Sequence, residues 1–456
     1  MPTTTTFSYG QRSKCADLLN SYNLSQIFDT ERAVFMKTVG IIAEYNPLHN
    51  GHQYQIGQAK TLTGADYVIV VMSGDFVQRG EPAIYDKYTR TRMALNAGAD
   101  LVLELPSCFA IASAEDFASC GVSLLDQLGV VDHLCFGSEC GNVEPLKTAA
   151  EILAKEPDEY KEFLKNQLAE GAPFPKARAQ ALTNVMFRSG LYPEFDWNKL
   201  ISSPNNILGI EYIKALIRMN SRIQPVTVLR SGNGYHDINI LDDAIFASAS
   251  AIRKALMEGD PDVIRRQIPY PLENSGLSNQ SSAVFADDIS EILNFTLLDL
   301  NHKSEDFTLF SDVSKELSDR LSRQILDFDT FSGRIQSLKT KQYTYTRISR
   351  ALLHILLGIQ EADMKEFRSE GYAFYARVLG FKKQALPLLS EFKAKSRIPL
   401  ISKVANAEKI LAENPLARKS FQYDMHASHL YQMIQFQKSG IRSKNEFTNP
   451  VIIKEM

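Results

Sequence analysis

The sequence predicts an α/β domain with a parallel sheet, followed by an all-α C-terminal domain. Over the first 230 residues, short stretches rich in Val, Ile and Leu alternate with segments of helical periodicity. This alternation is typical of buried parallel strands joined by crossover helices. The strand-like stretches stop before a segment rich in Ser and Asn at 274–282, beyond which helical spacing prevails and lysine and arginine become frequent.

The predicted strands are short, apolar and spaced by about one βαβ unit. They are residues 38–45, 67–72, 101–105, 133–136 and 225–229. Apolar residues at three- and four-residue spacing predict helices at 51–60, 85–97, 114–127 and 206–219. The long segment 143–169 is also helical and is predicted to be an insertion. Together these strands and helices predict a doubly wound α/β sheet.

The domain boundaries follow from changes in pattern and from Pro, Ser and Asn clusters. Residues 1–35 are Thr-rich and weakly patterned, and we expect a loose extension there or a start-site artefact, because the first strand follows Met36. The α/β domain is expected at 36–270, a linker at 271–282 and a helical domain at 283–456.

The composition is that of an ordinary globular protein, with 456 residues, 44% hydrophobic and 23% charged. The five cysteines include no Cys-x-x-Cys pair, which argues against a disulfide scaffold or a zinc knuckle. No apolar run approaches the ~20 residues that span a bilayer, and the N-terminus lacks a signal-peptide pattern. We therefore expect a cytoplasmic protein with no membrane partner.

The net charge of −3 conceals an asymmetry along the chain. Residues 331–456 carry 21 Lys and Arg against 10 Asp and Glu, a net of +11, and residues 1–330 carry 29 against 43, a net of −14. Clustered cations favour phosphate backbones through counterion release, so the basic part predicts a nucleic-acid partner. The alternative is a lysine-rich, solvated helical surface.

The strongest local pattern is the strand-turn-helix at 40–52, in which His49 and His52 flank Gly51. Positions three apart at a helix start share one face, so both imidazoles can face one ligand. The unpaired N–H groups of the helix start favour an anion, and Gly51 lets the backbone approach it. The pattern predicts a phosphate site. Two alternatives remain open: the histidines only cap and pack a helix, or they bind zinc, for which no third ligand lies at local spacing.

This stretch resembles the His-x-Gly-His signature of the nucleotidyltransferase superfamily (the HIGH superfamily). The resemblance implies a Rossmann-like fold and histidines that stabilise the α-phosphate of ATP while pyrophosphate leaves. Residues 247–253, Ala-Ser-Ala-Ser-Ala-Ile-Arg, resemble the second phosphate-binding motif of that superfamily, although their small residues differ from its common form. On this resemblance Ser248 and Ser250 supply hydroxyl and N-cap contacts, and Arg253 binds the β- and γ-phosphates.

A closer resemblance covers nearly all of residues 36–411. The matching strings are residues 39–52, 72–83, 98–106, 136–139, 203–209, 234–237 and 338–350. Together they are similar to those of the bacterial tRNA(Met) cytidine acetate ligase family. The resemblance implies a two-step reaction in which acetate and ATP give acetyl-adenylate, and N4 of the wobble cytidine of elongator tRNA(Met) then takes the acetyl group. Mg²⁺ is expected with ATP, although no metal ligand can be named.

The family resemblance also implies which residues contact each substrate. The ATP set is Gly40, Ile41, Glu44, Tyr45, Asn46, Pro47, His49, Asn50, Gly51, His52, Gly137, Asn206, Arg230, Ser248, Ser250 and Arg253. His49 and His52 are the predicted catalytic residues. Without the resemblance, the favoured interpretation is a simple turn for Gly137 and a surface ion pair for Arg230.

Two further regions have predicted roles. The loop 75–81 is typical of a mobile lid, in which Gln78 and Arg79 lie between glycines. Arg79 can bind the acetate carboxylate, and the equal alternative is a solvent-facing arginine in a hairpin. We expect a helix from about Ser337, on which Tyr343, Arg347 and Arg350 share one face at four- and three-residue spacing. An aromatic ring and guanidinium groups on one face suit stacking on RNA bases and contact with phosphates. The predicted tRNA contacts are Lys339, Lys341, Tyr343, Arg347, Arg350, Lys382 and Lys383. The alternative is that Tyr343 packs inward and the arginines form ion pairs.

Two rival functions are left open. A small-molecule adenylyltransferase of the pantetheine-phosphate or nicotinamide-mononucleotide kind shares the histidine motif, but such enzymes are usually compact and lack a basic helical domain. A non-catalytic RNA-binding protein could keep the fold without activity. The oligomeric state, the selectivity for acetate over other short acids and the means of tRNA discrimination are not predicted.

Overall fold

The computed structural model describes residues 36–190, 196–230, 247–260, 266–269, 283–440 and 442–455. Contacts between residues divide the chain into two units, Met1–Met36 and Lys37–Met456, and everything below concerns the second unit. The predicted extension at 1–35, the linker at 271–282 and the string at 234–237 lie outside the described residues.

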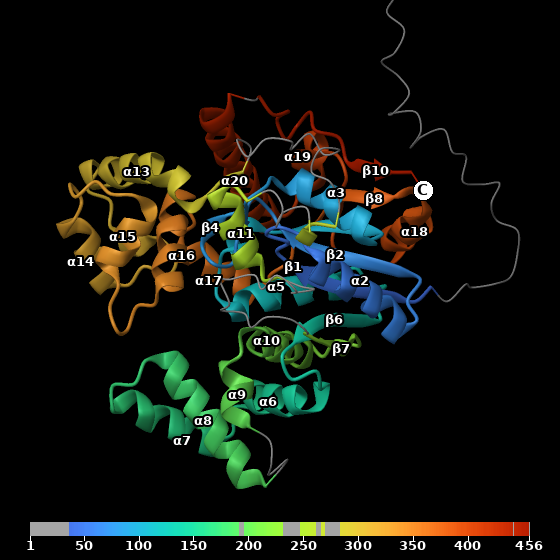
Figure 1. Cartoon of the computed structure of the whole chain (residues 1–456), viewed down its shortest axis with the longest axis horizontal. Coiled ribbons are helices and arrows are strands. Elements are labelled where there is room, and N and C mark those ends of the chain that lie inside the picture. Colours follow the sequence, from blue (N-terminus) through green and yellow to red (C-terminus); the bar gives the residue numbers. More distant parts are fainter. Residues whose placement is uncertain are drawn as a thin grey trace, which may run out of the picture. The chain divides into compact units, whose positions relative to one another are not determined.

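A single large sheet organises this unit (Figure 1). Its strand order is β10-β8-β5-β2-β1-β6-β7, and β9 pairs with β8. The bounds are β1 Thr38–Ala43, β2 Tyr67–Ser73, β5 Leu101–Leu105, β6 His133–Ser138, β7 Gln224–Leu229, β8 Ala376–Lys382, β9 Leu400–Ile401 and β10 Ile452–Lys454. The five strands β5, β2, β1, β6 and β7 are parallel and match the five predicted strands in position. The predicted Rossmann-like α/β class is therefore confirmed.

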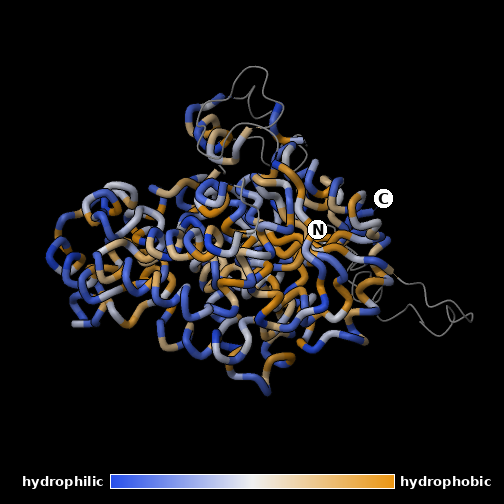
Figure 2. Tube along the Cα trace, turned by 90° about the horizontal axis from the view of Figure 1, so that it is seen from below, coloured by the Kyte–Doolittle hydropathy of each residue, from blue (hydrophilic) through white to orange (hydrophobic). Residues whose placement is uncertain are grey.

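Alternate residues of the central strands face two separate hydrophobic cores. Val39 and Ile41 of β1 pack in one core, which includes residues of helices α2 (Asn50–Thr63) and α3 (Lys87–Ala97). Ile42 packs in the other, which includes residues of α5 (Ala114–Gln127) and α10 (Pro204–Arg218). Because side chains alternate along a strand, helices must cover both faces of the sheet. Figure 2 shows the hydrophobic positions concentrated in the middle of the trace.

The predicted helices are present, and the insertion is larger than expected. Segment 143–169 forms two helices, α6 Val143–Lys155 and α7 Asp158–Ala169, since Pro157 separates them. Two more helices follow, α8 Phe174–Ser189 and α9 Trp197–Ser202. Short segments add α4 (Ser107–Ala110) and the antiparallel hairpin β3–β4 (Phe76–Val77 and Glu81–Pro82). The helix α11 (Ala249–Glu258) lies after β7.

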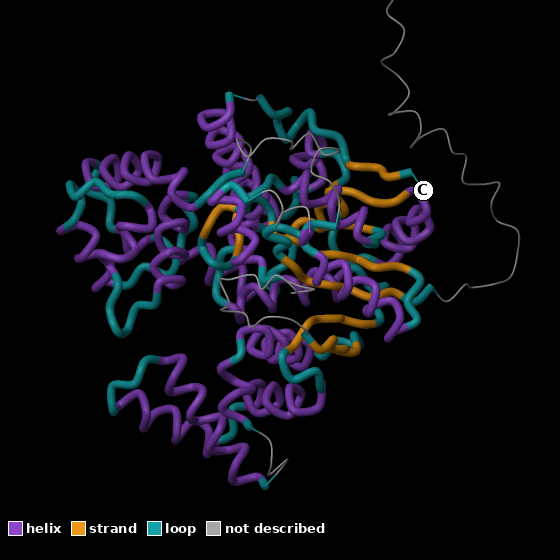
Figure 3. The backbone as a smooth tube through the Cα atoms, viewed as in Figure 1, coloured by secondary structure: helices purple, strands orange, loops and turns teal. Residues whose placement is uncertain are grey.

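The C-terminal part is mainly helical, as predicted, and helices alone make up its first half (Figure 3). These elements are η4 Ala286–Ile289, α13 Ser290–His302, η5 Phe307–Leu309, α14 Lys315–Arg323, α15 Phe331–Leu338, α16 Tyr345–Leu356, α17 Glu361–Ser369, η6 Lys383–Ala385, α18 Leu386–Lys395, η7 Val404–Asn406, α19 Ala407–Ile410 and α20 Pro415–Ser439. Among the described residues, none of the helices has the length and apolarity needed to cross a bilayer.

The expectation that strands end before residue 283 is wrong. Strand β8 pairs antiparallel with β5, and β9 and β10 each pair parallel with β8. The C-terminal part therefore extends the sheet of the α/β part. All but the last residue of β8 are buried, so it follows the rule for strands covered on both faces, although Arg377 interrupts its apolar run.

Candidate functional site

The candidate site lies at the carboxyl end of β1, the point at which the strand order of the sheet reverses. Strands β2 and β5 follow on one side of β1, and β6 and β7 lie on the other. The crossovers therefore run to opposite sides of β1, and open α/β sheets bind ligands at such switch points. The motif at 40–52 begins in β1 and ends in α2, so the topology places it at this edge.

The turn after β1 has an unusual backbone. Tyr45 has φ +48° with its side chain buried, and the Asn46–Pro47 peptide bond is cis. The side chain of Asn46 fixes the turn, since its Oδ1 accepts a hydrogen bond from Ile84 N at 2.7 Å. A bulky residue at positive φ is uncommon and is tolerated where surrounding contacts over-determine it. The turn therefore delivers His49 to the helix start in a defined position.

The two histidines cap the helix that they begin. His49 is the N-cap of α2, and its Nδ1 accepts from Gly51 N at 3.1 Å. The Nδ1 of His52 accepts in turn from His49 N at 3.3 Å. The rings are stacked with centroids 3.7 Å apart, and the edge of the Tyr45 ring packs on His52 at 4.9 Å. The capping interpretation of the histidines is thus correct, but it occupies only one nitrogen of each ring.

These hydrogen bonds determine which ring nitrogen carries the proton. A nitrogen that accepts from a backbone N–H has no proton, so each neutral imidazole is protonated at Nε2. Burial and the charges of Arg230 and Arg253 lower the pKa of His49 to about 3. Burial, His49 and Arg230 lower the pKa of His52 well below its usual value. Near neutral pH the pair therefore consists of neutral rings, each with an Nε2–H donor.

The second predicted motif lies beside the first. Ser248 is the N-cap of α11 and accepts from Ala251 N at 3.1 Å. Arg253 on that helix donates to the main-chain oxygen of Asn46 at 2.9 Å and forms an ion pair with Glu81 at 3.2 Å. Two segments about 200 residues apart in sequence therefore meet at the turn after β1, as a common phosphate site requires.

The predicted lid is the β3–β4 hairpin, and it contacts both motifs. The backbone N–H of Gln78 donates to Glu44 Oε1 at 2.9 Å, and Arg79 Nη1 donates to Ser250 Oγ at 3.3 Å. The tip is attached to α16, because Ser349 Oγ donates to Gly80 O at 2.6 Å. The pKa of Glu44 is raised chiefly by burial, against the opposing charges of Arg79 and Arg253.

Three further predicted ATP residues, Gly137, Asn206 and Arg230, lie around the ends of β6 and β7. A Cβ on Gly137 would lie 3.1 Å from Cγ of Arg230, so the side chain of this arginine crosses directly over the glycine. Asn206 is buried, and its Oδ1 accepts from the N–H groups of Glu139 and Cys140 at 2.9 and 3.2 Å. Asn206 thus supports the turn after β6 through its side chain.

Glu139 is a residue whose role the sequence did not reveal. Its carboxylate accepts from Asn205 N at 3.1 Å and from Asn206 N at 2.8 Å, at the start of α10. An anion at a helix start satisfies unpaired N–H groups. The signal was present, because Pro204 marks a first helical turn and residues 136–139 are one of the matching strings.

The remaining predicted ATP residues are fixed by nearby structure. Gly40 lies in β1, where a Cβ would come within 2.6 Å of a methyl group of Leu125, so a larger residue would force that side chain to move. Ile41 is a fully buried core residue of the same strand. Asn50 Nδ2 donates to the main-chain oxygen of Arg266 at 2.7 Å. Residue 266 lies just before the buried Gln267, whose Oε1 accepts from Ala247 N.

The single helix predicted from Ser337 to Arg350 is wrong. α15 ends at Leu338 and α16 begins at Tyr345, because Thr340 Oγ accepts from the N–H groups of Gln342 and Tyr343 and forms a turn. Tyr343 is buried, so its ring faces inward, which was the alternative. The guanidinium carbon of Arg347 lies over this ring, 4.8 Å from its centroid.

The basic residues of the C-terminal part differ in what they contact. Lys339 and Lys341 are exposed. Arg350 forms an ion pair with Asp312 at 3.3 Å. Lys382 contacts Asp100 at 3.5 Å and Lys383 contacts Glu455 at 3.3 Å. The exposed lysines are thus the predicted cations most open to a partner.

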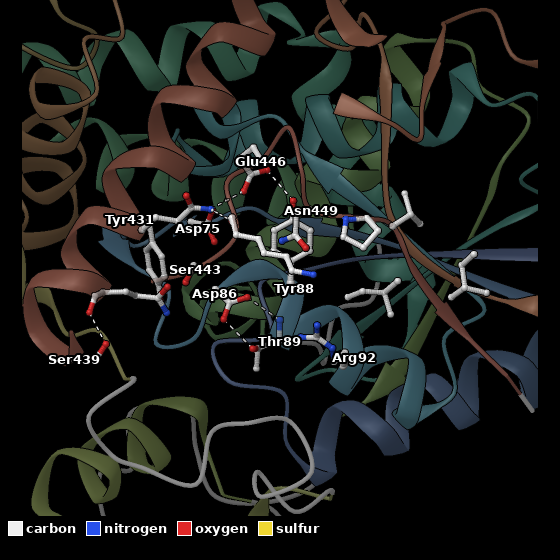
Figure 4. Close-up of a pocket in the computed structure, with 17 residues that line it drawn as sticks. Asp75, Asp86, Tyr88, Thr89, Arg92, Tyr431, Ser439, Ser443, Glu446 and Asn449 are labelled. Carbon is white, nitrogen blue, oxygen red and sulfur yellow. Dashed lines mark hydrogen bonds between the residues drawn. The ribbon is translucent and has the colours of Figure 1, made fainter. Parts of the chain in front are cut away.

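A pocket of about 500 Å³ lies elsewhere, between the start of α3 and the C-terminal segment (Figure 4). Asp75, Tyr88, Tyr431 and Glu446 are among its lining residues. His49, His52 and Arg253 do not line it. We assign the chemistry to the carboxyl end of β1, because that edge unites both predicted motifs. Over the described residues, no group of three or more His, Cys, Asp and Glu side chains is arranged to hold a metal ion.

Comparisons with known proteins agree with this geometry. A model of the HIGH Nucleotidyl Transferase family matches residues 36–446. The tRNA(Met) cytidine acetate ligase of Halothermothrix orenii is 40% identical over 425 residues, which cover 91% of this chain and 99% of that protein. That of Acetivibrio thermocellus is also 40% identical, over 92% of this chain and all of that protein.

A solved structure is similar as well. The crystal structure of Thermotoga maritima TmcAL bound with alpha-thio ATP superposes with a TM-score of 0.81 at 31% identity. The match covers 92% of this chain and 100% of that chain.

Proposed function

This chain belongs to the tRNA(Met) cytidine acetate ligase family of the HIGH nucleotidyltransferases, and we propose that it joins acetate to N4 of the wobble cytidine of elongator tRNA(Met) at the expense of ATP. An acetate oxygen attacks the α-phosphate, the bond to the β-phosphate breaks, and pyrophosphate leaves. The cytidine N4 then attacks the acetyl carbon, AMP leaves, and N4 loses one proton. The products are N4-acetylcytidine, AMP and pyrophosphate.

The arrangement of His49 and His52 is the observation that carries this proposal. Both rings are held by backbone hydrogen bonds to Nδ1, which leaves two Nε2–H donors at the start of α2. The α-phosphate gains negative charge as acetate attacks, and fixed donors at that position stabilise the transition state. Their low pKa values mean that they act as neutral hydrogen-bond donors and not as acids.

The arginines around the histidines supply the opposite charge for the phosphates. Arg253 lies at the turn after β1, and Arg230 is close enough to lower the pKa of both histidines. These contacts support the proposal that Arg253 binds the β- and γ-phosphates and that Arg230, over Gly137, binds the nucleotide end. Mg²⁺ is expected with ATP. Since the described residues provide no acidic cluster for it, we expect phosphate oxygens and water as its ligands.

The hairpin is the proposed acetate element. Arg79 reaches Ser250 of the second motif, and Gln78 N–H donates to Glu44 at the end of β1. A guanidinium at this position can bind a carboxylate beside the α-phosphate. Removing Arg79 should raise the KM for acetate without changing that for ATP, and unchanged acetate kinetics would exclude this role.

The tRNA is proposed to contact exposed cations of the C-terminal part. Lys339 and Lys341 lie on the turn between α15 and α16, and α16 also holds the tip of the hairpin at Gly80. The turn that carries these lysines leads into the helix that adjoins the hairpin. Exposed lysines bind phosphates as point charges, so their contribution is expected to depend on salt.

The experiment is acetylation of tRNA from cells that lack this protein, with ATP and radiolabelled acetate, followed by nucleoside analysis. Label in N4-acetylcytidine that disappears in His52→Ala establishes the ligase. Acetate-independent transfer of AMP to a phosphorylated small molecule would indicate the adenylyltransferase alternative. Binding of tRNA without pyrophosphate release from ATP would indicate the non-catalytic alternative.

A further inference from the structure

Helix α3 carries a buried arginine to which the reaction above gives no role. Its N-cap is Asp86, whose Oδ1 accepts from Thr89 N at 2.9 Å, and Arg90 follows in the first turn. The side chain of Arg90 is fully buried. A buried guanidinium with five N–H donors must find acceptors, because leaving them unpaired costs free energy.

Among the described residues, all the hydrogen bonds that Arg90 makes run to main-chain oxygens. Its Nε donates to Tyr85 O at 2.9 Å. Its Nη1 donates both to Glu44 O at 2.7 Å and to Ser73 O at 3.0 Å. Its Nη2 donates to Gly74 O. One guanidinium thereby joins the carboxyl ends of β1 and β2 and the segment before α3.

Arg90 makes no ion pair within the part of the chain that the structure describes. The carboxylates of Asp75, Asp86 and Glu104 act on it from a longer distance. Lys87, three residues earlier, differs: its Nζ lies 2.9 Å from Glu104 and 3.2 Å from Glu446. Figure 4 shows Asp75 and Glu446, which surround that lysine, at the pocket. The lysine is ion-paired, whereas the arginine holds the backbone.

The carbonyls that Arg90 binds lie at the start of the turn that leads to His49 and just before the β3–β4 hairpin. Glu44 directly precedes Tyr45, whose positive φ starts the turn to His49. Ser73 and Gly74 directly precede the hairpin that presents Gln78 and Arg79. A planar guanidinium can reach several carbonyls at fixed angles, and a lysine ammonium cannot.

We propose that Arg90 is a positioning residue that holds the histidine turn and the hairpin in register for adenylate formation, which rests on the proposed function. The guanidinium touches no substrate. It acts through the carbonyls of Glu44, Ser73 and Gly74, which set where the Nε2–H donors and Arg79 lie relative to each other.

The test is acetate-dependent exchange of pyrophosphate into ATP by Arg90→Lys in the full chain. A misplacement on the order of 1 Å at reacting groups costs about 100-fold in rate, so we expect kcat to fall about 100-fold. The KM for ATP should stay within about threefold, because the groups that bind ATP remain. Arg92→Lys is the matched control: it lies on the same helix and is exposed, and we expect wild-type kinetics from it.

Chemical rescue separates positioning from folding. Arg90→Gly should regain activity with methylguanidinium and not with methylammonium, while its melting temperature is followed in parallel. Restored stability without restored kcat, a variant that stays unfolded with methylguanidinium, or an Arg90→Lys enzyme with wild-type kcat would each overturn the proposal. If wild-type protein shows no exchange, the proposed function fails; if only the positioning role is wrong, wild-type exchange remains and Arg90→Lys retains its kcat.

Discussion

Replacing His49 by asparagine separates the two roles of its ring. In the wild type, Nδ1 accepts from Gly51 N and caps α2, which leaves Nε2–H as the donor of the ring. Asparagine is among the best N-cap residues, so its Oδ1 can replace Nδ1 as the acceptor. Its side chain is shorter than histidine and has no group at the position of Nε2. The substitution therefore keeps the cap and removes the donor.

The expected magnitudes differ for the two roles. Loss of one donor to a developing oxyanion costs about 2.7–4 kcal/mol, or about 100- to 1,000-fold in kcat. His49→Ala loses the same donor and also the cap, so it should be less stable than His49→Asn by about 1 kcal/mol. Both variants lose the stacking on His52, which cancels in the comparison.

Acetate-dependent pyrophosphate exchange measures the rate, and urea unfolding measures the stability. We expect two variants of equally low kcat and different stability. If His49→Asn kept kcat within about threefold of the wild type, against the 100-fold expected for a lost donor, then Nε2 would not act on the phosphate. Equal stability of the two variants would contradict the capping role.

Four further outcomes follow from other contacts. The unfolded chain protonates His49 and His52 below about pH 6.5, whereas the folded chain does not protonate His49 until about pH 3. The free energy of unfolding should therefore fall as the pH falls below 6.5. His49→Asn should lessen this dependence on pH, which urea titrations at several pH values measure. Gly137→Ala should displace Arg230 and raise the KM for ATP about tenfold, the worth of one hydrogen bond to a charged group, whereas Gly57→Ala, whose Cβ meets open space, should leave that KM unchanged. Joint replacement of Lys339 and Lys341 by alanine should reduce the salt dependence of tRNA binding by about two phosphate contacts in filter-binding assays, and Lys165→Ala on α7 should not. Tyr343→Phe should cost about 1 kcal/mol of stability through its lost hydrogen bond to Ser314 and leave the Kd for tRNA unchanged; weaker tRNA binding would restore Tyr343 as a contact.

The parallel strands and their helices could be predicted because their signals are local. Runs such as residues 67–72 are apolar on both faces, as covered strands must be. Strand β8 lacked such a signal, since Arg377 interrupts it and helices flank it on both sides. That arginine is tolerated because Glu104 and Glu446 pair with it, and Glu446 lies far along the chain. A strand stabilised by distant carboxylates cannot be predicted from its own residues.

The candidate site shows the same division between local and distant information. The spacing of His49 and His52 predicts one shared face, and the structure places the rings together. Which nitrogen remains available depends on ring orientation, which spacing does not determine. Arg90 went unnoticed because a lone arginine in a helix pattern is usually exposed. Its importance comes only from the carbonyls that three separate segments bring to it.

The pairing of β8 with β5 has a consequence for synthesis of the chain. While the ribosome is making residues 106–375, β5 is an unpaired edge that lacks its neighbour, and Glu104 lacks the arginine partner that it has in the finished protein. Open strand edges invite pairing with other chains, and contacts distant in sequence form slowly. The nascent polypeptide thus carries an open edge of β5 until residues 376–382 have been made, and a chain that stops short of them keeps an edge prone to aggregation.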